Sequence, residues 1–459
     1  MKDTHNWNKL LSAVRFGKEN DTKAASEFAR TQFQRDYDRI IFSSPFRRLQ
    51  NKTQVFPLPG SVLVHNRLTH SLEVASVGRS LGSMVSAKIF EAKEADFADP
   101  ACLVGEIGTI VATACLAHDL GNPAFGHSGE KAISLYFKEG EGKKYKDQVS
   151  EAEWADLINF EGNANTLRIL THPFKGKGTG GFDLTYATLA ALIKYPCESS
   201  KPYVKGQIHT KKYGFFQSEK TTFEKITQQV PFHPDGASPL AFKRHPLVYL
   251  VEAADDICYT VIDVEDAHRL HILSEQETKD LLLPLIAAIS GQEKADRYNR
   301  WLDEYSEPND RIAFLRAVTI NQLTQACTEV FWENRQAILD GNLGSSLTDA
   351  LNPEAVACLK KIESISVNKI YNFPASVEIE LAGYKVMGDL LATFIPAVIE
   401  PTSHYAQKLL MLIPDQFKND NTSTYAKIQT VLDFVSGMTD LYAVELYRKI
   451  KGIEFPTLK

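Results

Sequence analysis

Cysteine is scarce in this sequence, and its spacing excludes a disulfide framework. Only six cysteines occur in 459 residues, and no two of them have C-x-x-C spacing. Cys115 and Cys258 lie in apolar stretches with helical periodicity, which favours buried, reduced thiols. We therefore expect free cysteines in a cytoplasmic protein.

Long apolar runs are also missing. No uninterrupted apolar stretch approaches the ~18 residues of a membrane-spanning helix. The first ten residues, MKDTHNWNKL, lack the apolar segment of a secretory signal. We expect neither a membrane segment nor secretion. The Gly-rich stretch 172–183 contains GKGTGG, which departs from the GxxxxGK[ST] pattern of a nucleotide-binding P-loop.

The chain lacks an excess of positive charge. Its formal net charge is −6, which argues against a protein that coats nucleic acid. Residues 1–55 are the exception, with 11 Lys and Arg against 6 Asp and Glu. This basic segment is interpreted either as a solvated helix face or as an electropositive rim for a polyphosphate or a single-stranded nucleic acid.

Strand-like alternation is scarce, whereas helical periodicity runs through the whole chain. The pattern predicts an all-α fold with three principal helices near residues 66–90, 103–120 and 246–270. Asn66 is expected to cap the first helix, and Gly121 with Pro123 to end the second. The remaining expectations are short strands at Val204–Ile208 and Val377–Ile379, and loops at 138–152 and 172–183.

Three short motifs supply ligands for one divalent ion. They are RLTH ending at His70, the pair His118–Asp119, and ADD at 254–256. A bound divalent ion turns water into a nucleophile near neutral pH. An N/O ligand set without cysteine fits Mn, Mg, Fe, Co, Ni or Zn and does not choose among them.

The third motif lies on a helix with apolar neighbours. A carboxylate such as Asp255 is costly in such surroundings unless it is paired or binds a metal. A polar stripe at steps of three and four residues runs through this helix, and its members are Glu252, Asp255, Tyr259, Asp263 and Asp266. We interpret the stripe as one wall of a pocket.

Taken together, these stretches resemble the bacterial deoxyguanosinetriphosphate triphosphohydrolases of the HD phosphohydrolase superfamily. The resemblance begins at QRDYDRIIFSSPFRRLQNKTQVFP (Gln34–Pro57) and ends at SGMTDLYA near the C-terminus. Between them lie HNRLTHSLEVASVGRSLG, HDLGNPAFGHSGE, FEGNANTLRIL, LTYATLAALIKYP and VEAADDICYTVIDVED. The most specific part is HDLGNPAFGHSGE combined with ADDICYTVID.

The resemblance implies a role for eleven residues. The implied metal ligands are His70, His118, Asp119 and Asp255, which hold one ion per chain. His127 and Glu130 match the pair that supports the attacking water and proton transfer. Contacts to the triphosphate are implied for Arg67 and Lys194, and contacts around the deoxyribose for Gln54, Tyr259 and Asp263.

The implied reaction converts a deoxynucleoside triphosphate (dNTP) and water to a deoxynucleoside and intact triphosphate. The implied fold is a helical HD-domain core with the basic N-terminal segment (1–275), followed by a helical C-terminal region (276–459) that packs on it. The implied assembly is a dimer-based homo-oligomer, a tetramer or a hexamer. An activating dNTP or single-stranded DNA is a further implied partner. Leu441 stands where the family often has Arg, so contacts from the C-terminal third do not carry over.

Two other functions remain open from the sequence. One is a different HD enzyme, such as a phosphodiesterase or a 5′-nucleotidase, in which His127 serves as an additional metal ligand. The other is a single-stranded-DNA-binding protein that uses the basic N-terminal segment. Metal content per chain distinguishes the first alternative, and salt-sensitive DNA binding without turnover distinguishes the second.

Overall fold

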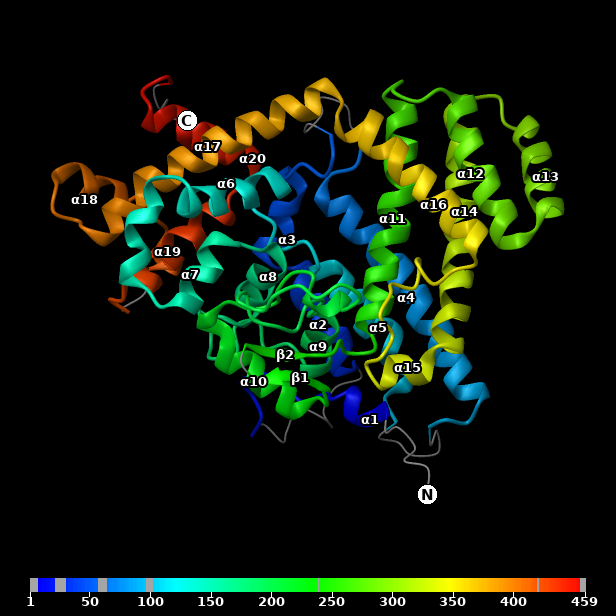
Figure 1. Ribbon diagram of the computed structural model, residues 1–459, viewed down its shortest axis with the longest axis horizontal. Helices are drawn as coiled ribbons and strands as arrows, with labels where there is room; N and C mark the ends of the chain where they lie inside the picture. Colours follow the sequence, from blue (N-terminus) through cyan, green and yellow to red (C-terminus); the bar gives the residue numbers. More distant parts are fainter. Residues whose placement is uncertain are drawn as a thin grey trace.

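The computed structural model describes residues 7–20, 30–56, 64–95, 102–237, 239–418 and 421–454. Helices dominate this part of the chain (Figure 1), which confirms the expected all-α fold. The only sheet among the described residues is a two-stranded antiparallel one, formed by β1 (Pro234–Ala237) and β2 (Leu240–Phe242). Its strands are too short to form a layer of their own.

The α-helices have the following bounds: α1 (Trp7–Leu10), α2 (Gln32–Ile41), α3 (Ser44–Arg48), α4 (Arg67–Glu91), α5 (Ile107–Ala117), α6 (Gly126–Lys138), α7 (Glu151–Ile158), α8 (Gly162–Thr171), α9 (Tyr186–Leu192), α10 (Lys220–Gln229), α11 (Val248–Arg269), α12 (Glu275–Ser290), α13 (Gln292–Trp301), α14 (Pro308–Glu333), α15 (Arg335–Leu339), α16 (Pro353–Ile365), α17 (Pro374–Ile399), α18 (His404–Leu410), α19 (Thr424–Ser436) and α20 (Asp440–Ile450). A short π-helical segment, Ser366–Tyr371, follows α16.

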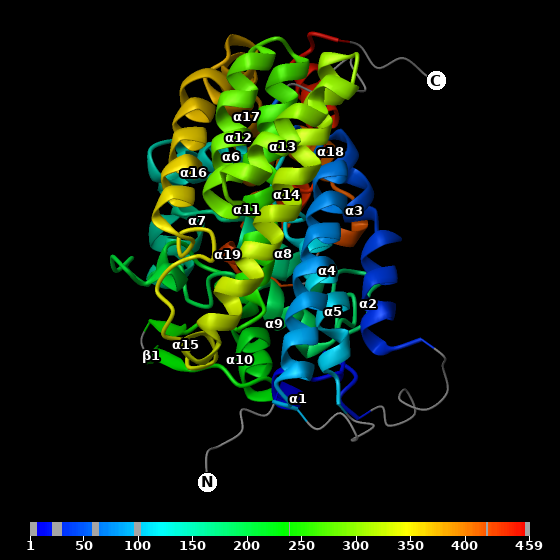
Figure 2. The same ribbon diagram turned by 90° about the vertical axis from the view of Figure 1, so that its right-hand side faces the viewer.

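The three principal helices form where the sequence predicts them. Asn66 caps α4, because its side chain accepts a hydrogen bond from the backbone N–H of Thr69. Helix α5 ends at Ala117, one residue before His118, and a 3₁₀ turn precedes it. Helix α11 packs against α4, α5 and α14, and Figure 2 shows α4, α11 and α14 running side by side.

Close packing between α4 and α5 depends on two glycines. A Cβ atom added at Gly82 would lie 2.8 Å from the Cα atom of Gly108, closer than real Cβ atoms approach backbone. The two helix backbones therefore touch where these glycines face each other. This contact fixes how closely α4 and α5 pack, about three turns along α4 from His70 and at the opposite end of α5 from His118.

One described helix, α17, bears on the expectation that the chain has no membrane segment. It meets the length and hydropathy of a membrane span, but Lys385 and Asp389 interrupt its apolar run. The helix packs against α6, α18, α19 and α20, and Figure 1 shows it crossing above α6 and α20. Because Met387, Leu391 and Phe394 are fully buried against these helices, α17 is a core helix in this fold.

Three local expectations were wrong. Val377–Ile379 lies inside α17, because Pro374 at the first turn begins a long helix there. Val204–Ile208 forms no strand and runs into a 3₁₀ turn at Ile208–Thr210. The expected loop at 138–152 contains a 3₁₀ segment and the start of α7, which Ser150 caps. The loop at 172–183 has no helix, as expected.

Two hydrophobic clusters form the interior. The larger cluster contains the buried faces of α4, α5 and α11 together with residues of α12, α14 and α16. The smaller cluster joins α6 and α7 to α17, α19 and α20. Both clusters draw residues from each side of position 275, and the division into 1–275 and 276–459 stays a prediction.

Candidate metal centre and active site

Three helices bring the four expected ligands together. His70 comes from the first turn of α4, His118 and Asp119 follow the end of α5, and Asp255 lies in the middle of α11. Ligand atoms of His70, His118 and Asp119 all lie within 4.8 Å of one another. The Oδ1 atom of Asp255 lies 3.1 Å from Nε2 of His70 and 3.5 Å from Nε2 of His118.

The orientation of His118 fits a metal ligand. Its Nδ1 lies 2.6 Å from the carbonyl oxygen of Cys115, so this nitrogen carries the proton and donates it. Its Nε2, which would bind a metal after loss of its proton, is buried without a hydrogen-bond partner. A buried nitrogen without a partner is costly unless something binds it. Nitrogen and carboxylate donors converge on this point, so the cluster is able to hold a divalent cation.

The electrostatic field at the cluster favours a cation. Although burial opposes its charge, the carboxylates of Asp119 and Asp255 raise the pKa of His118 to about 9. Although burial opposes ionisation, Arg67 and His118 lower the pKa of Asp119 to about 2. Both carboxylates are therefore ionised near neutral pH. Their negative potential attracts positive charge to the space between the ligands.

Two side chains fix the orientation of Asp119. Nη1 of Arg67 donates to Oδ2 of Asp119 over 2.7 Å, and Nδ2 of Asn122 donates to Oδ1 over 2.6 Å. Arg67 is buried, and its Nε has no partner among the described residues. Arg67 therefore binds the ligand Asp119 in this structure and does not line the adjoining cavity.

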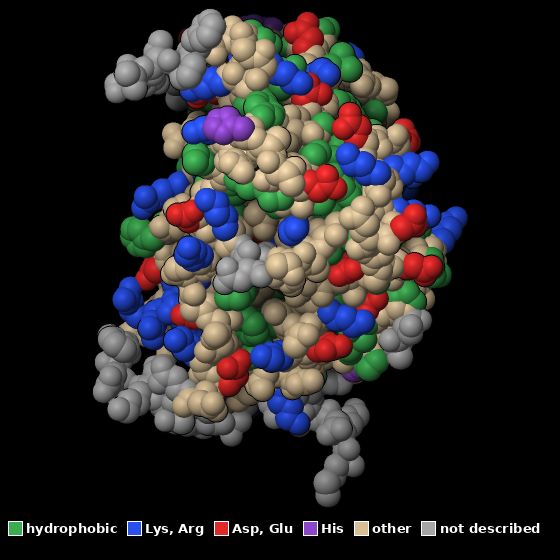
Figure 3. All heavy atoms as spheres, turned by 90° about the vertical axis from the view of Figure 1, so that its left-hand side faces the viewer, with side chains coloured by type: hydrophobic (Ala, Val, Ile, Leu, Met, Phe, Trp, Pro, Cys, Tyr) green, Lys and Arg blue, Asp and Glu red, His purple; other side chains and the backbone are tan. Residues whose placement is uncertain are grey.

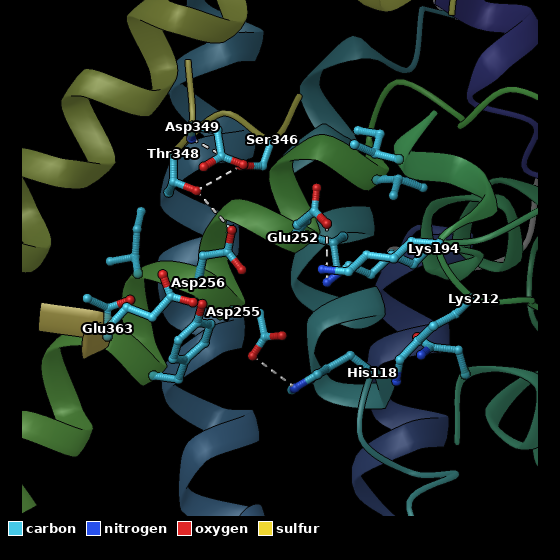
Figure 4. Close-up of a pocket in the computed structure, with 18 of the residues that line it drawn as sticks. His118, Lys194, Lys212, Glu252, Asp255, Asp256, Ser346, Thr348, Asp349 and Glu363 are labelled. Carbon is cyan, nitrogen blue, oxygen red and sulfur yellow. Dashed lines mark hydrogen bonds and ion pairs between the residues drawn. The ribbon is translucent and has the colours of Figure 1, made fainter. Parts of the chain in front are cut away.

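The cluster opens into a cavity of about 600 Å³. His118, Asp255, Lys194 and Tyr259 line it, as do residues from the C-terminal half of the chain. Figure 4 shows Asp255 pointing towards His118. Glu252 positions two basic side chains of this wall. Its carboxylate lies 3.3 Å from Nζ of Lys194 and accepts two hydrogen bonds from Arg244. The polar stripe of α11 thus forms a pocket wall through Glu252, Asp255 and Tyr259.

The far end of the cavity was not foreseen from the sequence. Thr348 donates a hydrogen bond to Asp256 over 2.9 Å, and Ser346 donates to Asp349 over 2.9 Å (Figure 4). Burial raises the pKa of Asp256 to about 7. Residues 346–349 lie in a connecting segment without a motif, so no local signal marks them.

His127 lies at the start of α6, beside the metal-ligand cluster. It is exposed to the cavity, and partial burial together with the Lys212 and Arg67 cations lowers its pKa. The imidazole is therefore mostly neutral at pH 7. No hydrogen bond joins His127 to Glu130 in the described structure. Glu130 is buried and instead accepts the backbone N–H of Gly162 over 2.8 Å.

The residues expected around the sugar lie in different places. Tyr259 lines the cavity, but Asp263 is buried behind its wall. Tyr371 connects the two regions, because it lines the cavity and its hydroxyl donates to Asp263 over 2.9 Å. Gln54 does not line the cavity, and its Oε1 is buried without a partner. Tyr371 carries no motif, and the sequence alone gave no reason to select it.

Some basic residues of the N-terminal segment form contacts inside the protein, whereas Lys18, Arg30 and Arg47 are exposed. Arg15 is buried and pairs with Asp36 over 2.7 Å, and Arg39 donates to the carbonyl oxygen of Phe182. Lys52 is buried as well. Figure 3 shows a face on which basic and acidic side chains are interspersed. The solvated helix face and the electropositive rim both stay predictions for this segment.

Comparison with known proteins places this geometry in a family. The sequence profile of the HD domain matches residues 67–159, and that of the phosphohydrolase-associated domain matches residues 350–449. A Synechocystis relative named deoxyguanosinetriphosphate triphosphohydrolase-like protein is 39% identical over 97% of this chain and 99% of its own length. A Pseudomonas aeruginosa relative of the same name is 38% identical over 98% of this chain and 100% of its own.

A more distant relative carries the name without the suffix. The deoxyguanosinetriphosphate triphosphohydrolase of Yersinia enterocolitica is 29% identical over 96% of this chain and 97% of its own length. The similarity therefore spans both the HD region and the helices that follow it. The chain belongs to the deoxyguanosinetriphosphate triphosphohydrolase-like family and is an HD-domain phosphohydrolase.

Proposed function

We propose that the protein hydrolyses a dNTP, with dGTP as the first candidate, to a deoxynucleoside and intact triphosphate. One divalent ion per chain is held by His70, His118, Asp119 and Asp255. The observation that carries the proposal is this buried N/O cluster at the floor of a cavity with lysines on its wall. The names of the relatives point to the same substrate class.

The chemistry divides between the ion and the side chains. A bound divalent ion supplies charge neutralisation and activation of water. Water attacks the α-phosphorus, and the bond from that phosphorus to the nucleoside 5′-oxygen breaks. The attacking water loses a proton and the departing 5′-oxygen takes one up, and the neutral imidazole of His127 accepts and returns a proton in this exchange. Lys194 neutralises charge that develops on the phosphate oxygens, while Arg67 keeps Asp119 in position.

The sugar lies along α11 in this proposal. Tyr259 follows Asp255 by one helical step of four residues and faces the same cavity. Its ring fills the space into which a ribose 2′-hydroxyl would project. Asp263 lies four residues further along α11 and accepts a hydrogen bond from the hydroxyl of Tyr371, which lines the cavity. Deoxyribonucleotides are therefore preferred over ribonucleotides, and Tyr259→Ala narrows the difference in kcat/KM between dGTP and GTP.

A product assay with metal analysis tests the reaction. Purified protein is incubated with each dNTP, alone and mixed, with Mn²⁺ or Mg²⁺, and the products are resolved by phosphorus NMR. Triphosphate as the primary inorganic product supports the proposal, and primary pyrophosphate or orthophosphate rejects it. Elemental analysis is expected to give one ion per chain, lost in His118→Ala. Two tightly bound ions would support the phosphodiesterase alternative, in which His127 is a ligand.

The cellular setting is also a proposal. The six cysteines are free, and four of them are buried, which is compatible with the reducing cytoplasm. Large apolar side chains on α17 and α20 and at the residue after α18 are exposed, among them Leu381, Leu441 and Met411. Exposed apolar patches of this kind mark subunit contacts, so we propose a dimer-based oligomer. Light scattering measures its size, with and without a dNTP or single-stranded DNA as effector.

A further inference from the structure

A second cavity adjoins the catalytic one. Its volume is about 820 Å³, and it lies between α6, α7 and the segment 199–213. The two cavities have four lining residues in common, namely His127, Glu161, Lys211 and Lys212. The second cavity, here termed the lysine groove, therefore starts where His127 stands and leads away from the metal-ligand cluster.

Lysines dominate the charge of the groove. Its lining includes Lys131, Lys138, Lys201, Lys211 and Lys212. Within the described parts of the chain, no ion pair engages Lys131, Lys138 or Lys211. The Nζ atom of Lys201 donates to the carbonyl oxygen of Asp235, which leaves its positive charge unpaired.

The acidic residues of the groove do not cancel this charge. Glu130 and Glu161 are its only carboxylates among the described lining residues, and both are buried. Glu130 accepts the N–H of Gly162. Glu161 pairs with Lys212 over 3.0 Å and also accepts from Asn163. Five lysines therefore face two carboxylates that already have partners, and the groove attracts a polyanion.

We propose that the lysine groove binds the inorganic triphosphate product as it leaves the catalytic cavity. This inference rests on the proposed function. The groove contains no residue of α11 and none of residues 346–371, which form the sugar side and the far end of the catalytic cavity. It joins that cavity at His127, where the phosphate chain ends up once its bond to the nucleoside breaks. The nucleoside and the triphosphate thus leave by different routes.

A double variant with reversed charge tests whether the groove binds tripolyphosphate, in an assay that needs no catalytic activity. Lys131→Glu with Lys138→Glu changes two exposed side chains of α6 that line only the groove. Lys294→Glu with Lys408→Glu is the matched control, since both lysines are exposed on distant helices. Calorimetric titration with sodium tripolyphosphate in metal-depleted buffer gives the affinity of each full-length chain. We expect the Kd to rise about 5–10-fold in the groove pair and less than about 2-fold in the control.

Unchanged tripolyphosphate affinity in the groove pair would overturn the proposal. A titration with dGTP under the same conditions distinguishes the free triphosphate from the tail of a second nucleotide. If only dGTP binding weakens in the groove pair, the groove holds a nucleotide effector and the product assignment is wrong. If only tripolyphosphate binding weakens, or both weaken alike, the assignment stands.

Kinetic measurements distinguish a role of the groove in product binding from a role in the chemical step. With an active enzyme, added tripolyphosphate should inhibit the groove pair with a Ki raised about 5–10-fold, while the single-turnover rate stays unchanged. If the wild-type protein hydrolyses no dNTP, the proposed function is wrong. If its tripolyphosphate affinity still falls in the groove pair, the polyphosphate site remains supported.

Discussion

At the scale of single residues, Tyr371 is the most informative side chain that the sequence did not mark. It ends the π-helical segment Ser366–Tyr371 and lines the catalytic cavity. Burial raises the pKa of Asp263 to about 7, although the hydrogen bond from Tyr371 opposes the shift. Tyr371 therefore connects the buried carboxyl group of Asp263, by a hydrogen bond, to the cavity wall that the sugar is proposed to contact.

Replacing Tyr371 with Phe removes this hydrogen bond and leaves the ring in place. A hydrogen bond to a charged group contributes about 1.5–3 kcal/mol, so kcat/KM for a dNTP should fall about 10-fold or more. Metal content should stay at the wild-type level, because Tyr371 is remote from the ligands. Steady-state kinetics measure the effect, and Tyr405→Phe on exposed α18 is the control. An unchanged kcat/KM would remove Tyr371 from the sugar site.

At the scale of elements, the turn between α5 and α6 sets the position of His127. Phe125 and Gly126 both adopt left-handed backbone conformations, with φ of 62° and 56°. Such a conformation is unfavourable for Phe and persists only where the surroundings hold it. Asp440, the first residue of α20, supplies this support. One of its oxygens accepts the N–H of Phe125 over 2.9 Å, and the other accepts that of Thr53 over 2.8 Å.

Asp440→Asn should loosen the turn, because the amide offers one backbone N–H only a neutral oxygen and leaves the other N–H without an acceptor. The expected cost is about 1.5–3 kcal/mol of unfolding free energy, with a lower kcat and retained metal. Urea unfolding and steady-state kinetics measure the two effects, with Asp310→Asn on exposed α14 as control. Wild-type kcat in a destabilised variant would mean that Asp440 supports only the fold.

At the scale of the whole molecule, a buried ion pair joins α8 to the C-terminal helix α19. Arg168 of α8 is fully buried and donates to both oxygens of Asp433 on α19, each over 2.7 Å. It also pairs with Glu219 over 2.7 Å. Glu219 also contacts His172 and Ser218, but removal of the guanidinium takes the nearest cation from both carboxylates and leaves buried charge uncompensated.

Arg168→Met should therefore lower the free energy of unfolding by about 3–5 kcal/mol. The partly exposed pair of Arg335 with Glu94 offers a matched control. Arg335→Met should cost no more than about 1 kcal/mol. Urea denaturation monitored by circular dichroism measures both values, and equal costs for the two variants would contradict the importance of the buried pair.

A second connection predicts a pH dependence. Lys52 donates to the carbonyl oxygens of Asn122 and Ser436, and burial together with Arg48 lowers its pKa to about 7 from 10.5. Between pH 7 and 10.5 the unfolded chain binds a proton that the folded chain does not. This group therefore makes the free energy of unfolding rise with pH across that interval and stay flat below it.

Comparison of wild type with Lys52→Met isolates this contribution. The variant should be less stable overall, because the two carbonyl groups lose their donor. Its free energy of unfolding should rise less steeply than that of the wild type between pH 7 and 10. Urea unfolding at several pH values gives both slopes, and parallel slopes would show that Lys52 titrates normally in the folded protein.

The sequence by itself determined the features that depend on neighbours along the chain. Periodicity and the Asn66 cap located α4, and periodicity located α11. The motifs, together with the family resemblance, indicated His70, His118, Asp119 and Asp255 as one ligand set. Short apolar stretches such as 377–379 were misjudged, because a few residues do not distinguish a strand from a helix.

Only the tertiary structure decided the contacts between distant segments. Asp440 lies 387 residues from Thr53 and 315 from Phe125, and Tyr371 lies 108 residues from Asp263. No local pattern encodes such pairs, because packing of whole helices brings them together. The lysine groove is of the same kind, since its lysines come from α6 and from the segment 199–213. The motifs predict which residues bind the metal, whereas the packing of the helices determines which residues surround them.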